Sequence, residues 1–188
     1  MRTVLFKRDR IRILLILNIF FLCGLSQAQY FELYGIIQQM KGDKTIFQEE
    51  ELNVADNTMG GFGAGMNIDN INLNMAFLFG STAVTSKSIN LESKLFAVEA
   101  NLDYAFISGI ISPVVSAGIG SVNFTDSFTA YENFNETNFS YNIAGGLRCV
   151  FSEHILLKAL YKATWTKIKE TDSAIQLDGI AVHVGYIF

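Results

Sequence analysis

Residues 139–151 read FSYNIAGGLRCVF, and this stretch decides the fold class. Apolar or aromatic side chains occupy most alternate positions from Phe139 to Phe151, and mainly small or polar residues stand between them. Successive side chains of a strand point to opposite faces, so this period of two predicts a β-strand with one apolar and one small-polar face. Residues 95–106, LFAVEANLDYAF, repeat the alternation.

The same alternation recurs after residue 29 and predicts eight strands. The connections alternate in length, because long segments such as 41–57 and 124–137 are separated by turns as short as Asp69-Asn70 and Glu153. Short turns at one end of an up-and-down sheet and longer loops at the other are typical of outer-membrane barrels. The predicted strands are Tyr30–Met40, Thr58–Ile68, Ile71–Ser81, Leu91–Phe106, Ile110–Asn123, Asn138–Ser152, His154–Ile168 and Leu177–Phe188.

The composition indicates that the apolar residues of this chain lie in strands rather than in spanning helices. The 188 residues are 50% apolar but only 17% charged, against about 25% charged in soluble domains. No window after residue 29 holds the roughly 18 consecutive apolar residues of a spanning helix. The many aromatics exclude a disordered chain. A formal net charge of −4 argues against a nucleic-acid binder.

The alternation alone leaves a soluble alternative, a lipocalin-like barrel with its apolar face inward. Here the less apolar face is largely Gly, Ala, Ser, Asn and Thr, with too few charges for a typical water-exposed surface. The other face carries aromatics too bulky for an eight-stranded interior. We therefore predict an all-β fold, an eight-stranded antiparallel up-and-down transmembrane β-barrel with the apolar face toward lipid. Closure of the sheet satisfies the backbone hydrogen bonds that hydrocarbon leaves without water.

Residues 1–28 predict a cleaved secretory signal peptide, and 29–188 the barrel domain. Five basic residues precede an almost wholly apolar run, and Ser26-Gln27-Ala28 supplies small residues at the −3 and −1 positions. A membrane anchor is the alternative, but the run is shorter than the roughly 20 residues of a spanning helix. A lipoprotein through Cys23 is weaker, because Leu22 stands where a small residue is expected. Without the signal, 9 basic and 17 acidic residues remain, a net charge of −8.

Six charged residues fall on the predicted inward face. A buried charge without a partner is unfavourable, so we expect these residues to pair across the lumen in a structural network. A proton or ion path through the network is the alternative. The six are Glu32, Glu99, Asp103, Arg148, Lys158 and Lys162.

The longer loops hold the candidates for external contact. Aromatic residues lie among polar ones in the third outer loop, and exposed aromatics are frequent contact groups in interfaces. An extension of the strands beyond the membrane is the alternative explanation. The four aromatics are Phe124, Phe128, Tyr131 and Phe134.

Motifs of catalysis are missing from the sequence. Neither His154 nor His183 begins a catalytic or metal-binding arrangement, and glycine-rich residues 60–65 lack the Lys-Ser/Thr that follows in a phosphate loop. We therefore predict no catalytic residue, no metal site and no cofactor.

These residues resemble the small eight-stranded outer-membrane barrels of the OmpA/OmpX-type class of Gram-negative bacteria. The cleavage site, the alternating strands and the final VHVGYIF (residues 182–188) carry the resemblance. The Ser26–Gln29 junction and the Asn-rich strands are similar to Bacteroidetes-type barrels. Tyr186 and the terminal Phe188 resemble the signal read by the barrel-assembly machinery, although His183 stands where that signal usually has glycine.

The resemblance implies a non-enzymatic outer-membrane protein with a structural or surface-contact role in adhesion or envelope stability. Its expected partners are outer-membrane lipid, the barrel-assembly machinery, and an external protein or surface ligand bound by the long loops; nucleic acid is not among them. A narrow channel or a transport- or secretion-accessory barrel stays open as an alternative. A lipid A-modifying enzyme is less favoured, because neither histidine matches the outer-rim position that such enzymes use.

Overall fold

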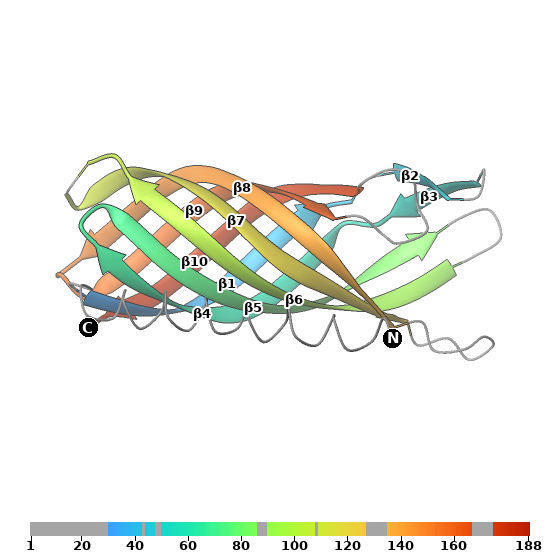
Figure 1. The fold of residues 1–188 in the computed structure, drawn as a ribbon, viewed down its shortest axis with the longest axis horizontal. Helices are drawn as coiled ribbons and strands as arrows, with labels where there is room; N and C mark the ends of the chain where they lie inside the picture. The colour runs from blue at the N-terminus through green and yellow to red at the C-terminus, as the bar shows by residue number, and fades with distance from the viewer. Residues whose placement is uncertain are drawn as a thin grey trace, which may run out of the picture.

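A computed structural model describes residues 30–42, 44–47, 50–85, 90–107, 109–126, 135–166 and 175–188. Their strands form one antiparallel sheet that closes on itself (Figure 1). No helix in these ranges is long and apolar enough to cross a membrane. The barrel strands are β1 (Tyr30–Lys41), β4 (Asn57–Ile68), β5 (Ile71–Thr85), β6 (Asn90–Ala105), β7 (Ile111–Asp126), β8 (Asn135–Phe151), β9 (Ile155–Thr166) and β10 (Ile175–Ile187); β2 (Lys44–Phe47) and β3 (Glu50–Val54) form a further hairpin.

Each barrel strand pairs with its neighbours in the sequence, and β1 closes the barrel on β10. In that closing ladder Ile37 stands opposite Val182. Every barrel strand therefore has a partner on both sides, which removes the unpaired edge that a membrane-spanning sheet cannot leave in lipid. The prediction of an eight-stranded antiparallel up-and-down barrel is confirmed.

The two ends of the barrel differ (Figure 1). The short turns at Asp69-Asn70 and at Ser152–His154 lie at the same end as the start of β1 and the chain's final residue. Asp69 has φ 52° and Glu153 has φ 64°, left-handed conformations in which the chain reverses direction tightly. The hairpin of β2 and β3 projects from the opposite end. We call these the short-turn end and the outer end.

Burial alternates along the strands, most regularly in β1, where every second side chain is buried. The outward positions carry large apolar residues: Ile37 is 66% exposed and Phe139 64%. This apolar band stops toward the outer end, where Gln39 is exposed and Ser81 pairs with Lys94. The apolar face thus points outward, toward lipid, as the sequence predicts.

Segment 41–57, predicted as a loop, is corrected by the structure. It contains β2 and β3, and β3 adds to β5 through the pairs Asn53–Thr85 and Val54–Val84. The strands of the barrel also continue past the apolar band, so that β5 ends only at Thr85. The reason is that β5 exposes hydrogen-bonding groups beyond the closed part of the barrel, and a neighbouring strand satisfies them.

The lumen is also less uniformly small and polar than predicted. Tyr34, Ile36 and Leu78 are buried inside it. Glycine makes the room: a Cβ on Gly63 would lie 2.5 Å from the Tyr34 ring, and one on Gly185 would lie 2.5 Å from the Tyr34 Cβ. Large residues therefore fit an eight-stranded interior where glycines face them on adjacent strands.

Candidate functional site

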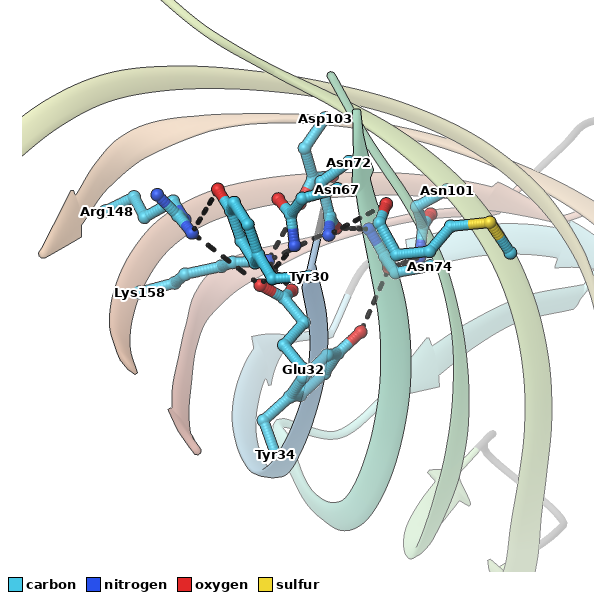
Figure 2. A network of polar contacts seen from close by, with 11 residues as sticks. Tyr30, Glu32, Tyr34, Asn67, Asn72, Asn74, Asn101, Asp103, Arg148 and Lys158 are labelled. Carbon is cyan, nitrogen blue, oxygen red and sulfur yellow. Dashed lines mark hydrogen bonds and ion pairs between the residues drawn. The ribbon is translucent and has the colours of Figure 1, made fainter. Parts of the chain in front are cut away.

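The interior charges form two groups, and the larger one is centred on Lys158 of β9 (Figure 2). The Lys158 Nζ lies 2.5 Å from Glu32 Oε1 and 3.2 Å from Asp103 Oδ2. Lys158 and Glu32 are both fully buried. In an apolar interior each charge would be strongly unfavourable alone, so the pair is held by mutual neutralisation and added hydrogen bonds.

Arg148 of β8 joins this group from the short-turn end. One guanidinium nitrogen lies 3.8 Å from Glu32 Oε2 and donates a hydrogen bond of 3.3 Å to the Tyr30 hydroxyl (Figure 2). The guanidinium carbon also lies 5.9 Å from the centroid of the Tyr30 ring. Its Nε is buried and has no hydrogen-bond partner.

Asparagines continue the network across the lumen. Asn67 donates to Glu32 Oε2 at 3.2 Å, and Asn74 donates to Asn72 at 2.8 Å. The hydroxyl of Tyr34 donates to Asn74 Oδ1 at 3.0 Å, and Asn101 donates to the same oxygen at 3.3 Å. Asn67 thus bonds directly to a buried carboxylate, and Asn74 and Asn101 extend the network by amide-to-amide hydrogen bonds, which strengthen one another in a buried setting.

The second group is the pair of Lys162 on β9 and Glu99 on β6. Lys162 Nζ lies 2.5 Å from one carboxylate oxygen of Glu99 and 2.6 Å from the other. It also donates to Gln38 at 3.4 Å. This pair lies two pleat repeats further toward the outer end than Lys158, since residues 158 and 162 share the inward face of one strand.

Two cavities border these groups. A vestibule of about 690 Å³ at the short-turn end is lined by Tyr30, Asn72 and Arg148 among others. A much smaller cavity of about 20 Å³ lies around Lys162 and Glu99. Asp103 lines both cavities.

The structure thus brings four of the six predicted charges together in one group and places the other two in a separate pair. All six point inward, where the sequence alternation places them. The reasoning from sequence did not single out Tyr30, Tyr34 or Gln38 as partners. Their inward parity on β1, which they share with Glu32, is the signal that identifies them.

His183 of β10 also faces the lumen. Its ring stacks on Tyr34, with centroids 5.0 Å apart and planes 6° from parallel, and its Nδ1 has no partner. His154 lies instead at the short-turn end, where its Nδ1 is 3.1 Å from the Ile187 carbonyl oxygen. Its ring stacks on Tyr186.

Most of the predicted contact aromatics lie outside the described residues. Phe128, Tyr131 and Phe134 fall between Asp126 and Asn135, and the signal-peptide prediction for residues 1–28 also lies outside the described part. Phe124 belongs to β7, where its backbone pairs with Glu136 of β8. The part of that segment nearest the membrane is therefore strand rather than loop.

The C-terminal residues lie at the seam where the barrel closes. The Phe188 amide donates to the Phe31 carbonyl at 2.8 Å, which adds one bond beyond the β1–β10 ladder. Tyr186 and Phe188 are both exposed on the outward face, and their rings pack edge to face with centroids 5.0 Å apart. Their predicted role in assembly stays a prediction.

A closed barrel with an apolar exterior and a neutralised ionic interior is the architecture of a protein that crosses a membrane as a sheet. The chain belongs to the family described as outer membrane protein beta-barrel domain, which matches residues 19–188. It is therefore an outer-membrane barrel protein. No curated protein matches the chain.

Solved structures share the fold at low identity. The Neisserial surface protein A is 13% identical, with 84% of this chain and 95% of that chain covered and a TM-score of 0.60. OprG from Pseudomonas aeruginosa is 12% identical, with coverages of 86% and 97% and a TM-score of 0.59. Ail, the attachment invasion locus protein of Yersinia pestis, solved with a heparin analogue, is 13% identical, with coverages of 85% and 97% and a TM-score of 0.52.

Proposed function

We propose that this barrel is a non-enzymatic surface protein that contacts an external partner, or stabilises the envelope, through its outer end. The observation that carries the proposal is the extension of the sheet past the apolar band. β5 reaches Thr85, and the hairpin of β2 and β3 is hydrogen-bonded to it. The pairs Asn53–Thr85 and Val54–Val84 attach this hairpin to the barrel, and a preorganised surface loses less entropy on binding than a free loop.

The interior supports a contact role over solute transport. Buried side chains such as Tyr34 and Leu78 occupy the lumen, and the central cavity has only about 20 Å³. A solute that entered the vestibule would meet the Lys158 ion pairs, whose disruption leaves uncompensated buried charge. The name of Ail refers to attachment, and this fold-level likeness adds to the proposal without identifying the partner.

The positions of the histidines favour a non-enzymatic role. His183 is enclosed in the lumen against Tyr34, and His154 lies at the short-turn end. Neither is placed on the outward face near the outer rim, where a membrane lipid would reach it.

The test compares cells that express the wild-type protein with cells that express a variant whose residues 44–53 are replaced by a short Gly-Ser linker. Adherence to immobilised mucin and gelatin is measured for both kinds of cell and for non-expressing cells. Envelope stability is measured as resistance to SDS with EDTA. Wild-type cells should adhere better, or resist SDS with EDTA better, than non-expressing cells. We expect the variant to lose this difference while its barrel stays heat-modifiable on gels. Wild-type cells that equal non-expressing cells in every assay would exclude the proposed role.

A further inference from the structure

Tyrosine and tryptophan are unevenly distributed on the outward face of the barrel. In the part of the chain that the structure describes, Tyr104 and Tyr186 lie outward at the short-turn end, and the other outward residues of these two types lie on β8 and β9. They are Tyr141, Tyr161 and Trp165. The register row of Gln39, Thr58 and Ser81, at the outer boundary of the apolar band on β1, β4 and β5, has neither type. An aromatic belt that only anchors a barrel surrounds it, so this clustering requires a local explanation.

The indole of Trp165 is held by a neighbour on each side. Tyr141 is its register partner on β8, and the two rings stack with centroids 5.2 Å apart and planes 16° from parallel. Gln176 is its register partner on β10, and the indole Nε1 donates to the Gln176 Oε1 at 3.1 Å. An aromatic ring that is fixed before binding loses less entropy when a ligand packs on it.

A carboxylate lies beside these rings on the outward face. The Tyr161 hydroxyl donates to Asp178 Oδ2, and among the described residues the other oxygen of Asp178 accepts no hydrogen bond. Ala163 is the register partner of Asp178, and on the outward face of β9 it lies between Tyr161 and Trp165. Two aromatic rings therefore flank the single methyl group of Ala163, with an acceptor oxygen next to it.

This set of groups has the chemistry that a sugar ring requires. Binding sites for small molecules combine aromatic surface with a few placed polar groups. The C–H face of a sugar packs on an aromatic ring, while its hydroxyls donate to a carboxylate such as Asp178 and accept from an amide such as Gln176. An acyl chain offers Asp178 no hydrogen bond. Lys41, opposite Asp178 in the β1–β10 ladder, adds a cation for an acidic substituent on the sugar.

The height of these groups on the barrel indicates where the sugar comes from. Asp178 pairs with Lys41, two residues beyond Gln39, where the apolar band of β1 ends. Side chains that point outward at this level meet the headgroups of the outer leaflet. We propose that this sector of β8, β9 and β10 binds the sugar headgroup of an outer-leaflet glycolipid, with the sugar ring against Trp165 and Tyr161 and its hydroxyls on Asp178. The site is separate from the hairpin of β2 and β3 and does not depend on the role of that hairpin.

The experiment uses the fluorescence of Trp165, which is the only tryptophan of the chain and therefore reports on this site alone. The full barrel is placed in phosphatidylcholine vesicles that contain increasing fractions of rough lipopolysaccharide. A second series contains phosphatidylglycerol, which is anionic but has no sugar. In a third series the deacylated, soluble core oligosaccharide of the same lipopolysaccharide is added to phosphatidylcholine vesicles. We expect a saturable change in the Trp165 emission with lipopolysaccharide and none in the other two series.

Two variants test the proposed contacts. Asp178→Ala and Tyr161→Leu should each raise the half-saturating fraction of lipopolysaccharide by about tenfold, because a hydrogen bond to a charged group or a packed ring is lost. Tyr104→Leu, a matched outward tyrosine at the short-turn end, should leave that fraction unchanged. Each side chain is at the surface, so the barrels should stay heat-modifiable.

Four results would overturn the proposal. They are no response of wild type to lipopolysaccharide, an unchanged half-saturating fraction in both Asp178→Ala and Tyr161→Leu, an equal response to phosphatidylglycerol, and an equal response to the soluble oligosaccharide. The third would show that the site responds to negative charge rather than to sugar. The fourth would show that the ligand is a soluble saccharide rather than a lipid.

Discussion

Lys158 Nζ lies 2.5 Å from Glu32 Oε1, although 126 residues separate the two in the sequence. They come from β9 and β1, which are not hydrogen-bonded neighbours because β10 lies between them. The contact therefore exists only across the interior of a closed barrel. It joins the first strand to the last third of the chain, so the stability that this pair contributes depends on closure of the barrel.

Substitution of Lys158 by methionine should strongly destabilise the barrel. The change leaves Glu32 and Asp103 buried without their shared cation, and breaking a buried pair typically costs about 3–5 kcal/mol. Urea unfolding in lipid vesicles measures the loss. Lys41→Met, an exposed lysine on β1, should change the free energy of unfolding by less than about 0.5 kcal/mol. Equal stability of Lys158→Met and wild type would show that the pair is not buried as described.

Gly63→Ala should destabilise the barrel, and Gly60→Ala on the same strand should not. A Cβ at Gly63 would lie 2.5 Å from the Tyr34 ring and 2.7 Å from the Met75 carbonyl oxygen, whereas a Cβ at Gly60 meets nothing within 4 Å. Overpacking of this kind costs typically about 1–3 kcal/mol. The comparison is made by the urea midpoint of each folded variant. If the two alanine variants unfold together, Tyr34 does not occupy the space beside Gly63.

Ile37→Lys should reduce stability more than Gln39→Lys. Both positions face outward on β1, but Ile37 lies within the apolar band and Gln39 at its outer boundary. A lysine near the bilayer midplane costs about 2–4 kcal/mol, falling to about 0–1 kcal/mol near the interface. Unfolding in vesicles gives both values. Similar values at the two positions would place the lipid boundary elsewhere.

Phe188→Ala should lower the amount of barrel that reaches the outer membrane. The resemblance of the last strand to the assembly signal predicts this effect, and Phe188 is 65% exposed on the outward face. Phe151→Ala is the matched control, because Phe151 is also an outward aromatic at the short-turn end. The readout is the heat-modifiable band in outer-membrane fractions. Equal losses in the two variants would indicate a general effect of lipid-facing aromatics rather than a signal in the last strand.

The strand pattern and its two faces were predictable because burial in a sheet repeats every two residues. The outward placement of Phe139 and Ile143 and the inward placement of Glu32 and Lys158 follow directly from that repeat. The extent of the strands was less predictable. Beyond the membrane the outward residues become polar, as at Lys94, and the alternation of hydrophobicity that marks a strand disappears there.

Residue parity, composition and loop lengths were enough to predict the barrel class, the sense of its faces and the set of charges inside. Only the tertiary structure decided which charges pair, that Glu99 takes Lys162 while Glu32 and Asp103 share Lys158. It also decided that Gly63 and Gly185 are the residues that leave room for the Tyr34 side chain in the lumen. The physical reason is closure of the barrel. The register and tilt of the strands set which strands face each other across the interior, and no local sequence pattern specifies which side chains then come into contact.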